Sequence, residues 1–348
     1  MQKITLKRSG LTVSRIGFGG LPIQRTSEKD AIAVIRRSLD LGVNLIDTAN
    51  GYTVSEGYIG KAIADYPRDQ LILATKTRAR DYKTAKEHIM LSLERFDTKY
   101  IDIYMLHNVS DLPVLDQVLA NDGAFFALEE ARKAGVIGHI GVSSHGHQTA
   151  LAAAKLGCFE TMMYPFNFVA HEPGEEVLAE CKSNNIDFFA MKPMGGGRLD
   201  NAMLAFKFLL NIPGVVPFVG IEKPEEIEEI VDIEKNLSPL NGDEQAEIKR
   251  IVDEIGDRFC RRCRYCMPCP EGIIIPLLNN LITFLRHDSA EQCFGPGIVA
   301  KTVETARGCT ECGECEERCP YNLPIIEMNK ENIALYEKVK AEYERSMK

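Results

Sequence analysis

Eight cysteines stand in two short groups near the carboxyl-terminal end of the chain, mostly with two residues between neighbours. Thiolates this close together on a short loop suit a shared metal centre better than a disulfide framework. Such a centre points to a reducing compartment, where thiols stay free. The first group consists of Cys260, Cys263, Cys266 and Cys269, and the second of Cys309, Cys312, Cys315 and Cys319.

The second group reads CTECGECEERCP, which is the C-x2-C-x2-C-x3-C-P run of bacterial ferredoxins. The first group, CRRCRYCMPCP, matches this run except for a last gap of two residues. In such pairs the fourth cysteine of one run ligates the other cluster. We therefore expect two [4Fe–4S] clusters, and one as the minimum. Zinc held by paired C-x2-C units is the alternative. The expected ligand sets are Cys260, Cys263, Cys266 with Cys319, and Cys309, Cys312, Cys315 with Cys269.

A second set of residues could move protons: Asp47, Tyr52, Lys76 and His107. A phenol has a pKa of about 10 and is a poor acid at neutral pH. A lysine ammonium about 4 Å away, at an effective dielectric near 20, favours the phenolate by about 4 kcal/mol. That interaction would lower the tyrosine pKa by up to about three units, near the working pH. With Asp47 orienting Lys76 and His107 orienting a carbonyl group, Tyr52 could donate a proton to the carbonyl oxygen as hydride reaches the carbon.

Eight apolar runs with the character of strands, each followed by a helical pattern, fill about the first 235 residues. This alternation predicts an α/β fold, a (β/α)8 TIM barrel, whose active residues stand at the carboxyl ends of strands. A doubly wound sheet is the alternative, but GFGGLP after the first strand lacks the G-x-G-x-x-G turn. A hairpin turning at Ser9–Gly10 comes first. The expected strands are 15–20, 44–49, 71–76, 101–107, 137–144, 161–166, 187–193 and 215–221.

The pattern changes at about Ser238, where the alternation of strands and helices stops. The two cysteine groups flank an apolar segment, 273–285, and a long charged helix is expected at 327–348. We therefore predict a barrel domain over 1–239 and a smaller, mostly α-helical domain over 240–348.

The barrel region resembles the aldo-keto reductases. GVNLIDTANGYTVSEGYIGKAI is similar to the family signature around the catalytic aspartate and tyrosine, and LATKT and YMLH are similar to the segments that carry its lysine and histidine. The resemblance covers about residues 3–235. It implies an NAD(P)-dependent oxidoreductase that reduces an aldehyde or ketone, or oxidises the corresponding alcohol, with Tyr52 as general acid/base.

The resemblance also implies contacts for a nicotinamide cofactor, NADP or NAD. The carboxamide would lie at GVSS, where Ser144 replaces the usual asparagine, and Met163 and Met191 replace the usual glutamine and stacking aromatic residue. After the eighth strand, Glu222 and Glu226 accompany a lysine and would repel a 2′-phosphate, which leaves NAD open. The expected cofactor-binding residues are Ser143, Ser144, Met163, Met191, Gly195, Gly196, Gly197, Arg198 and Lys223.

The tail resembles helical ferredoxin modules, but its role in the chemistry is open. A hydride carries two electrons and a cubane cluster accepts one, so the two cofactors do not simply exchange equivalents. Either the clusters are structural, covering the mouth of the active site, or they relay single electrons to or from a partner protein. The alternative function is an electron-transfer or redox-sensing module built on a nicotinamide-binding barrel.

Composition limits the remaining classes. The formal net charge of −9 disfavours a general nucleic-acid binder, and no apolar run reaches the roughly 20 residues of a membrane span. The first residues lack the apolar segment of a signal peptide. We expect a soluble cytoplasmic protein. Its other cysteines, Cys158, Cys181 and Cys293, are expected to be small buried hydrophobic residues.

Overall fold

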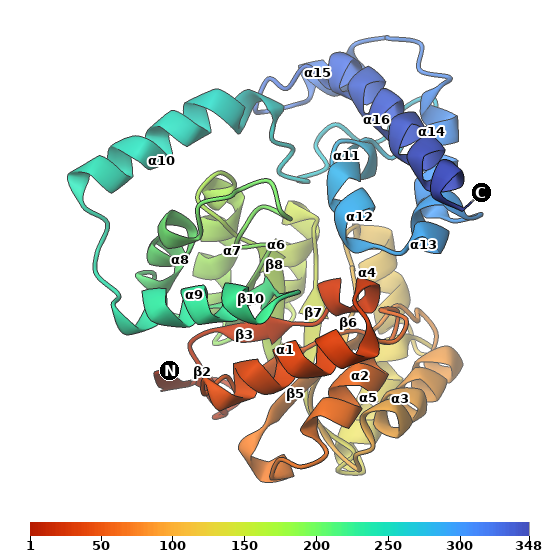
Figure 1. The fold of residues 1–348 in the computed structure, drawn as a ribbon. Coiled ribbons are helices and arrows are strands. Elements are labelled where there is room, and N and C mark those ends of the chain that lie inside the picture. Colours follow the sequence, from red (N-terminus) through yellow and green to blue (C-terminus); the bar gives the residue numbers. More distant parts are fainter. Residues whose placement is uncertain (348) are drawn as a thin grey trace. The chain divides into compact units, whose positions relative to one another are not determined.

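The structure is a computed structural model that describes residues 1–347. The chain divides into two compact units, Met1–Asn241 and Gly242–Lys348. In the first unit, eight parallel strands close into a barrel, which confirms the predicted fold class (Figure 1). In order around the barrel the strands are β10 (Val215–Gly220), β3 (Gly17–Gly19), β4 (Leu45–Asp47), β5 (Ile72–Thr77), β6 (Ile101–Leu106), β7 (Ile137–Ser143), β8 (Thr161–Pro165) and β9 (Asp187–Met191).

Helices surround this barrel (Figure 1). Several begin at a side chain that caps free backbone N–H groups: Ser27 accepts from the N–H of Asp30, and Asp81 from that of Thr84. One helix of the barrel, α4 (Leu112–Leu119), was not predicted; Asp111 caps it. The others are α1 (Glu28–Asp40), α2 (Ser55–Ile63), α3 (Tyr82–Phe96), α5 (Ala124–Lys133), α6 (His147–Lys155), α7 (His171–Ser183), α8 (Ala202–Leu210) and α9 (Pro224–Lys235).

The predicted amino-terminal hairpin is present as β1 (Lys3–Thr5) paired antiparallel with β2 (Thr12–Ser14). Its apolar residues Leu6 and Val13 are buried in the same cluster as Phe189 and other residues that fill the barrel. The hairpin therefore contributes to the core of the barrel.

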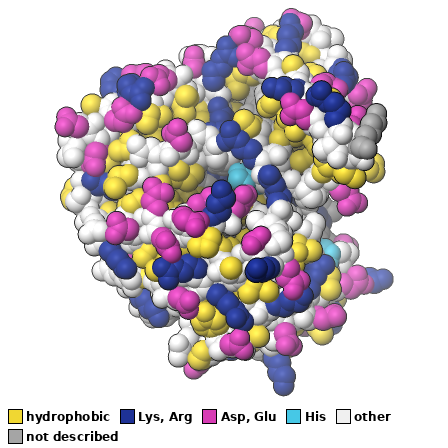
Figure 2. Space-filling model, viewed as in Figure 1, with side chains coloured by type: hydrophobic (Ala, Val, Ile, Leu, Met, Phe, Trp, Pro, Cys, Tyr) yellow, Lys and Arg dark blue, Asp and Glu magenta, His cyan; other side chains and the backbone are white. Residues whose placement is uncertain are grey.

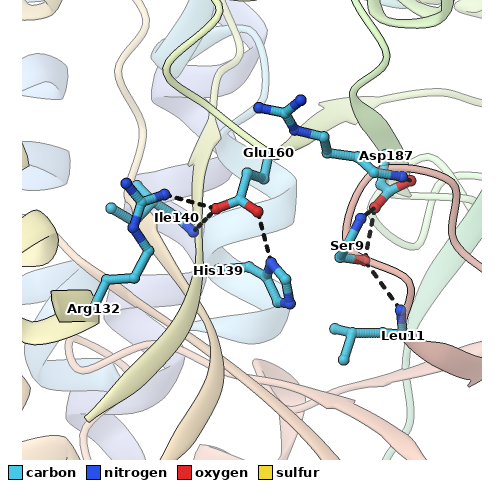
Figure 3. Close-up of polar contacts among 8 residues, drawn as sticks. Ser9, Leu11, Arg132, His139, Ile140, Glu160 and Asp187 are labelled. Atoms are coloured by element: carbon cyan, nitrogen blue, oxygen red, sulfur yellow. Dashed lines mark hydrogen bonds and ion pairs between the residues drawn. The ribbon is translucent and has the colours of Figure 1, made fainter. Parts of the chain in front are cut away.

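Polar contacts tie this hairpin to the amino-terminal ends of the strands. Asp187, the first residue of β9, accepts hydrogen bonds from the backbone N–H of Ser9 at 2.9 Å and from its hydroxyl at 2.8 Å (Figure 3).

A second polar cluster at this end of the barrel does not involve the hairpin. Glu160, just before β8, contacts His139 Nδ1 at 2.7 Å and Arg132 at 3.0 Å (Figure 3). Polar residues at this end of a TIM barrel usually serve stability.

The second unit is built from helices, as predicted. Its buried core includes Leu278, Leu281, Val303, Met328 and Tyr336. The expected charged helix is α16, which begins two residues earlier than predicted, while Lys348 lies outside the described residues. The helices are α10 (Gly242–Ile255), α11 (Ile275–Leu278), α12 (Leu281–His287), α13 (Ala290–Phe294), α14 (Ile298–Ala306), α15 (Glu314–Glu317) and α16 (Ile325–Ser346).

On the face shown in Figure 2, basic and acidic side chains are interspersed. No helix within residues 1–347 combines the length and apolar character needed to cross a membrane.

Candidate active site and candidate cluster cavities

A buried ion pair joins two neighbouring barrel strands. The Lys76 ammonium, in β5, lies 2.6 Å from both carboxylate oxygens of Asp47, the last residue of β4. It also donates to the carbonyl of Thr48 at 2.6 Å. Lys76 is 1% and Asp47 5% exposed, so the pair is removed from solvent. All three donors of the ammonium are therefore satisfied at the carboxyl end of the strands.

Burial and pairing act in opposite directions on both charges. Burial raises the pKa of Asp47 to about 6, while the Lys76 ammonium beside it lowers that pKa. Burial likewise lowers the pKa of Lys76, and its contact with Asp47 raises it. The pair thus supplies a fixed, oriented Lys76 ammonium. Its attraction to the Asp47 carboxylate offsets the cost of removing both charges from water.

This pair predicts a large stability effect. Lys76→Met leaves the Asp47 carboxyl buried without its counter-ion, and we expect a loss of about 3–5 kcal/mol in the free energy of unfolding. Urea unfolding of the full chain, followed by far-UV circular dichroism because the chain has no tryptophan, measures it. The matched control is Lys61→Met, because the ion pair of Lys61 with Glu28 is exposed and should contribute less than about 1 kcal/mol. Equal losses in the two variants would contradict the buried-pair interpretation.

Tyr52 and His107 complete the cluster of predicted catalytic residues. Tyr52 lies in the turn before α2, and the Lys76 ammonium is 5.5 Å from the centre of its ring. His107, directly after β6, packs edge-on against the same ring, with centroids 5.6 Å apart and an angle of 82°. The structure therefore brings the four residues together from three successive strand ends.

His107 is held in its neutral form. Burial lowers the pKa of its imidazole well below the usual value, and the positive charges of Arg78, Lys76 and Arg80 lower it further. A neutral imidazole keeps one N–H donor and one acceptor nitrogen. Within residues 1–347 the buried Nδ1 of His107 has no hydrogen-bond partner.

Glu56 and Arg95, which were not predicted as site residues, support the turn that carries Tyr52. Glu56 is 1% exposed and accepts from the Thr75 hydroxyl at 2.7 Å. Its other oxygen lies 3.0 Å from the Arg95 guanidinium, which also donates to the carbonyl of Asn50 at 2.9 Å. Because the two residues lie 39 positions apart, no local pattern in the sequence indicates this pairing.

The predicted carboxamide contacts lie side by side on β7 and β8. Ser143 pairs with Met163 in the strand register, and the Ser144 N–H donates to the Met163 carbonyl at 3.0 Å. All three residues are buried. The Ser143 hydroxyl accepts from the Asn108 N–H at 2.9 Å, while Ser144 exchanges hydrogen bonds with the Gly146 backbone. Both hydroxyls thus already contact the backbone of loops around the strand ends.

The other expected cofactor residues follow β9 and β10. Met191 ends β9, and the loop after it runs through Gly195, Gly196 and Gly197 with φ of 59°, 72° and 82°. Three consecutive left-handed residues favour glycine and leave the backbone open to a close ligand. Arg198 follows this loop, and the exposed Lys223 precedes α9. The loops after the seventh and eighth strands form the usual phosphate site of such barrels.

In the second unit, the cysteines line two cavities that match the predicted ligand sets. Cavity A has Cys260, Cys263, Cys266 and Cys319 in its wall. Cavity B has Cys269, Cys309, Cys312 and Cys315 in its wall. Cys266 also borders cavity B. Cysteines of both groups therefore line each cavity, which is the arrangement that the crossed ferredoxin pattern predicts.

The donor chemistry fits a cluster better than one metal ion. Four thiolates on zinc, with bonds of about 2.3 Å, converge on a single point. No three His, Cys, Asp or Glu side chains converge in that way in the described part of the chain. Burial raises the pKa of Cys263 to about 11 and that of Cys266 to about 12. Thiolates there consequently need the positive charge of bound iron, which couples cluster binding to folding.

The fold and the two sites define a barrel oxidoreductase joined to an iron–sulfur domain, and comparison with known proteins identifies both parts. The family model described as Aldo/keto reductase family matches residues 15–205, and the chain belongs to this family. A second model, described as 4Fe-4S dicluster domain, matches residues 259–323.

Relatives and solved structures agree with this assignment. Aldo-keto reductase YhdN from Bacillus subtilis is 35% identical over 205 residues, which cover 53% of this chain and 60% of that protein. The chain thus spans less than two thirds of this relative. The holo form of an aldo-keto reductase from Bacillus halodurans aligns with TM-score 0.63 and 25% identity, covering 72% of this chain and 96% of that one. A Klebsiella pneumoniae aldo-keto reductase in complex with NADPH shares the fold, with TM-score 0.62 and 22% identity. The alignment covers 72% of this chain and 96% of that one.

Proposed function

We propose that the barrel reduces an aldehyde or ketone, or oxidises the corresponding alcohol, with NAD(H) or NADP(H). A bound nicotinamide would supply or accept the hydride. Tyr52 donates the proton to the carbonyl oxygen, Lys76 stabilises the phenolate that remains, and Asp47 keeps Lys76 charged and oriented. The neutral His107 offers an N–H to the same carbonyl oxygen.

One observation carries this proposal: a buried ammonium, fixed by Asp47, lies 5.5 Å from the ring of Tyr52. Oriented ammonium charge in a site shielded from water stabilises developing phenolate far more than it would in solution. The His107 ring, packed edge-on against the tyrosine, limits the positions that the Tyr52 hydroxyl can take.

The test is an anaerobic activity screen. Protein purified with its clusters is offered a panel of aldehydes and ketones with NADH and with NADPH, and nicotinamide absorbance is followed. We expect turnover of at least one carbonyl compound. Cofactor that binds tightly while the whole panel stays untouched would contradict the enzyme proposal.

That second outcome would favour another function, a redox-sensing or electron-transfer module. The specific observation in its favour is the buried pair Ser144 and Met163, which offers no side-chain amide for a carboxamide. A sensor would bind the nicotinamide without turning over a substrate. Carbonyl turnover that continues after loss of the clusters, with the fold preserved, would count against it.

For the second unit we propose two [4Fe–4S] clusters, one in each cavity. Each would be held by the four cysteines of cavity A or cavity B and would carry single electrons. The crossed arrangement of the ligands supports two clusters. We further propose a cytoplasmic location and a redox partner protein that exchanges these electrons.

We also propose that the barrel prefers NADH to NADPH, because carboxylates stand at the start of α9. The Glu226 carboxylate accepts from the N–H groups of Glu222 at 2.7 Å and Lys223 at 3.2 Å. The N–H groups that would otherwise attract a phosphate at this helix terminus are therefore occupied. A 2′-phosphate here would face the negative charges of Glu222 and Glu226.

We expect NADPH to bind about tenfold more weakly than NADH, since repulsion between near charges in water is about 1 kcal/mol per pair. Glu226→Gln removes the charge but keeps an acceptor oxygen, and it should narrow that difference. Isothermal titration of both cofactors measures it. Glu229→Gln, on an exposed residue one turn further along the same helix, is the matched control and should leave the difference unchanged. Tighter binding of NADPH by the unaltered protein would overturn the preference.

A further inference from the structure

Two buried asparagines occupy equivalent places after the two Cys-Pro steps of the second unit. Asn279 follows Cys269 by ten residues in CPEGIIIPLLN, and Asn329 follows Cys319 by ten in CPYNLPIIEMN. Asn279 ends the short helix α11, and Asn329 stands near the start of α16. They are 3% and 2% exposed. The unit thus repeats a cysteine run, a turn and a helix that presents a buried amide.

These amides lack the partners that buried amides need. Both polar atoms of the Asn279 side chain, and Oδ1 of Asn329, are buried without a hydrogen bond within residues 1–347. Leaving such atoms unpaired is costly, and native proteins rarely do so. The adjacent Asn280 shows the ordinary case, because its amide donates to the carbonyl of Pro276 at 3.0 Å.

Each unpaired amide borders a different cluster cavity. Asn279 lines cavity A, and Asn329 lines cavity B. The repeat therefore places an amide beside each set of four cysteines. For either residue, a half-turn of the amide exchanges its oxygen and nitrogen, so each can offer N–H to the cavity.

We propose that Asn279 and Asn329 each donate an amide N–H to a sulfur of the cluster in their own cavity and so raise its reduction potential. Reduction adds negative charge to the cluster, and a donor aimed at sulfur stabilises the reduced state more than the oxidised state. Hydrogen bonds to the sulfurs are among the features that set cluster potentials. The inference rests on the proposal that both cavities hold a cluster.

The test replaces each amide by a side chain of similar size without a donor, in the full chain. Asn279→Leu and Asn329→Leu proteins are reconstituted anaerobically and titrated potentiometrically while electron paramagnetic resonance follows each cluster. We expect each variant to lower the potential of one cluster, a different one in each case, and to leave the other unchanged. Asn279→Ser and Asn329→Ser, which keep a donor, should restore part of the shift.

The control is Asn280→Leu, which removes a buried amide that already has a backbone partner. It should shift neither potential, and a shift as large as that of Asn279→Leu would overturn the proposal. Unchanged potentials in both Leu variants at full iron content would also overturn it. If a Leu variant loses its cluster, the Ser variant decides: a lowered potential of the cluster in that cavity alone supports the hydrogen-bond role, and a potential equal to that of the unaltered protein rejects it. Iron for only one cluster in the unaltered protein would instead reject the two-cluster proposal.

Discussion

Tyr52→Phe is expected to lower kcat for carbonyl reduction about 10²–10⁴-fold, the range that a positioned acid usually contributes. Removal of one hydroxyl should leave the affinity for the nicotinamide unchanged. Steady-state kinetics on the best substrate of the carbonyl panel, together with cofactor titration, measure both quantities.

The size of this effect follows from the surroundings of the phenol. The carboxylate that Lys76 contacts directly in the described structure is that of Asp47, with Glu56 a more distant negative charge, and the remaining donor of the ammonium goes to a carbonyl. Its charge is therefore available to stabilise the Tyr52 oxygen as the proton leaves. His107, kept neutral by burial, supplies no proton that could replace that of Tyr52 at neutral pH.

A tyrosine nearby provides the matched control. Tyr58 lies one turn into α2 and is half-buried, as Tyr52 is, but makes no contact with Lys76 or His107 among the ring contacts of residues 1–347. Tyr58→Phe should retain the full kcat. Equal turnover by the Tyr52→Phe protein would remove Tyr52 from the mechanism and leave water or another acid as the proton source.

The barrel was predictable because its signal is local. Each strand is a short apolar run between helical patterns, and all eight strands form where the runs lie, as β5 (Ile72–Thr77) does for the run 71–76. Barrel closure then follows from the count of units, and it brings Asp47, Lys76 and His107 to one end of the strands. The helix α4 was missed because it is short and contains a proline, although Asp111 gives a capping signal.

What the sequence did not reveal depends on contacts between distant residues. Glu56 reaches Arg95 across 39 positions, and no periodicity encodes that pairing. Asn279 and Asn329 look like ordinary polar residues of helix termini until the structure buries them beside the cysteine cavities. The hydrogen bonds between the Ser144 hydroxyl and the Gly146 backbone likewise depend on the folded loop.

The second large effect concerns the metal. Anaerobically purified protein should be brown and contain about eight irons per chain, since two complete sets of four cysteines line separate cavities. Cys263→Ala should lose the cluster of cavity A, and Cys312→Ala that of cavity B, so that each retains about four irons. Cys263 and Cys312 each line one cavity, so their variants separate the two clusters better than a Cys266 variant would, because Cys266 borders both cavities.

Cys293→Ala is the control for loss of a buried thiol as such. Cys293 is 2% exposed, lines neither cavity and donates to the Phe284 carbonyl at 3.3 Å, so iron should stay at about eight per chain. The raised pKa values of Cys263 and Cys266 imply that loss of iron leaves neutral thiols around an empty space. Each cavity variant should therefore also unfold part of the second unit, seen as lost helical dichroism. About four irons in the fully reconstituted unaltered protein would show that one cavity binds no cluster, and zinc without iron or sulfide would reject the ferredoxin assignment altogether.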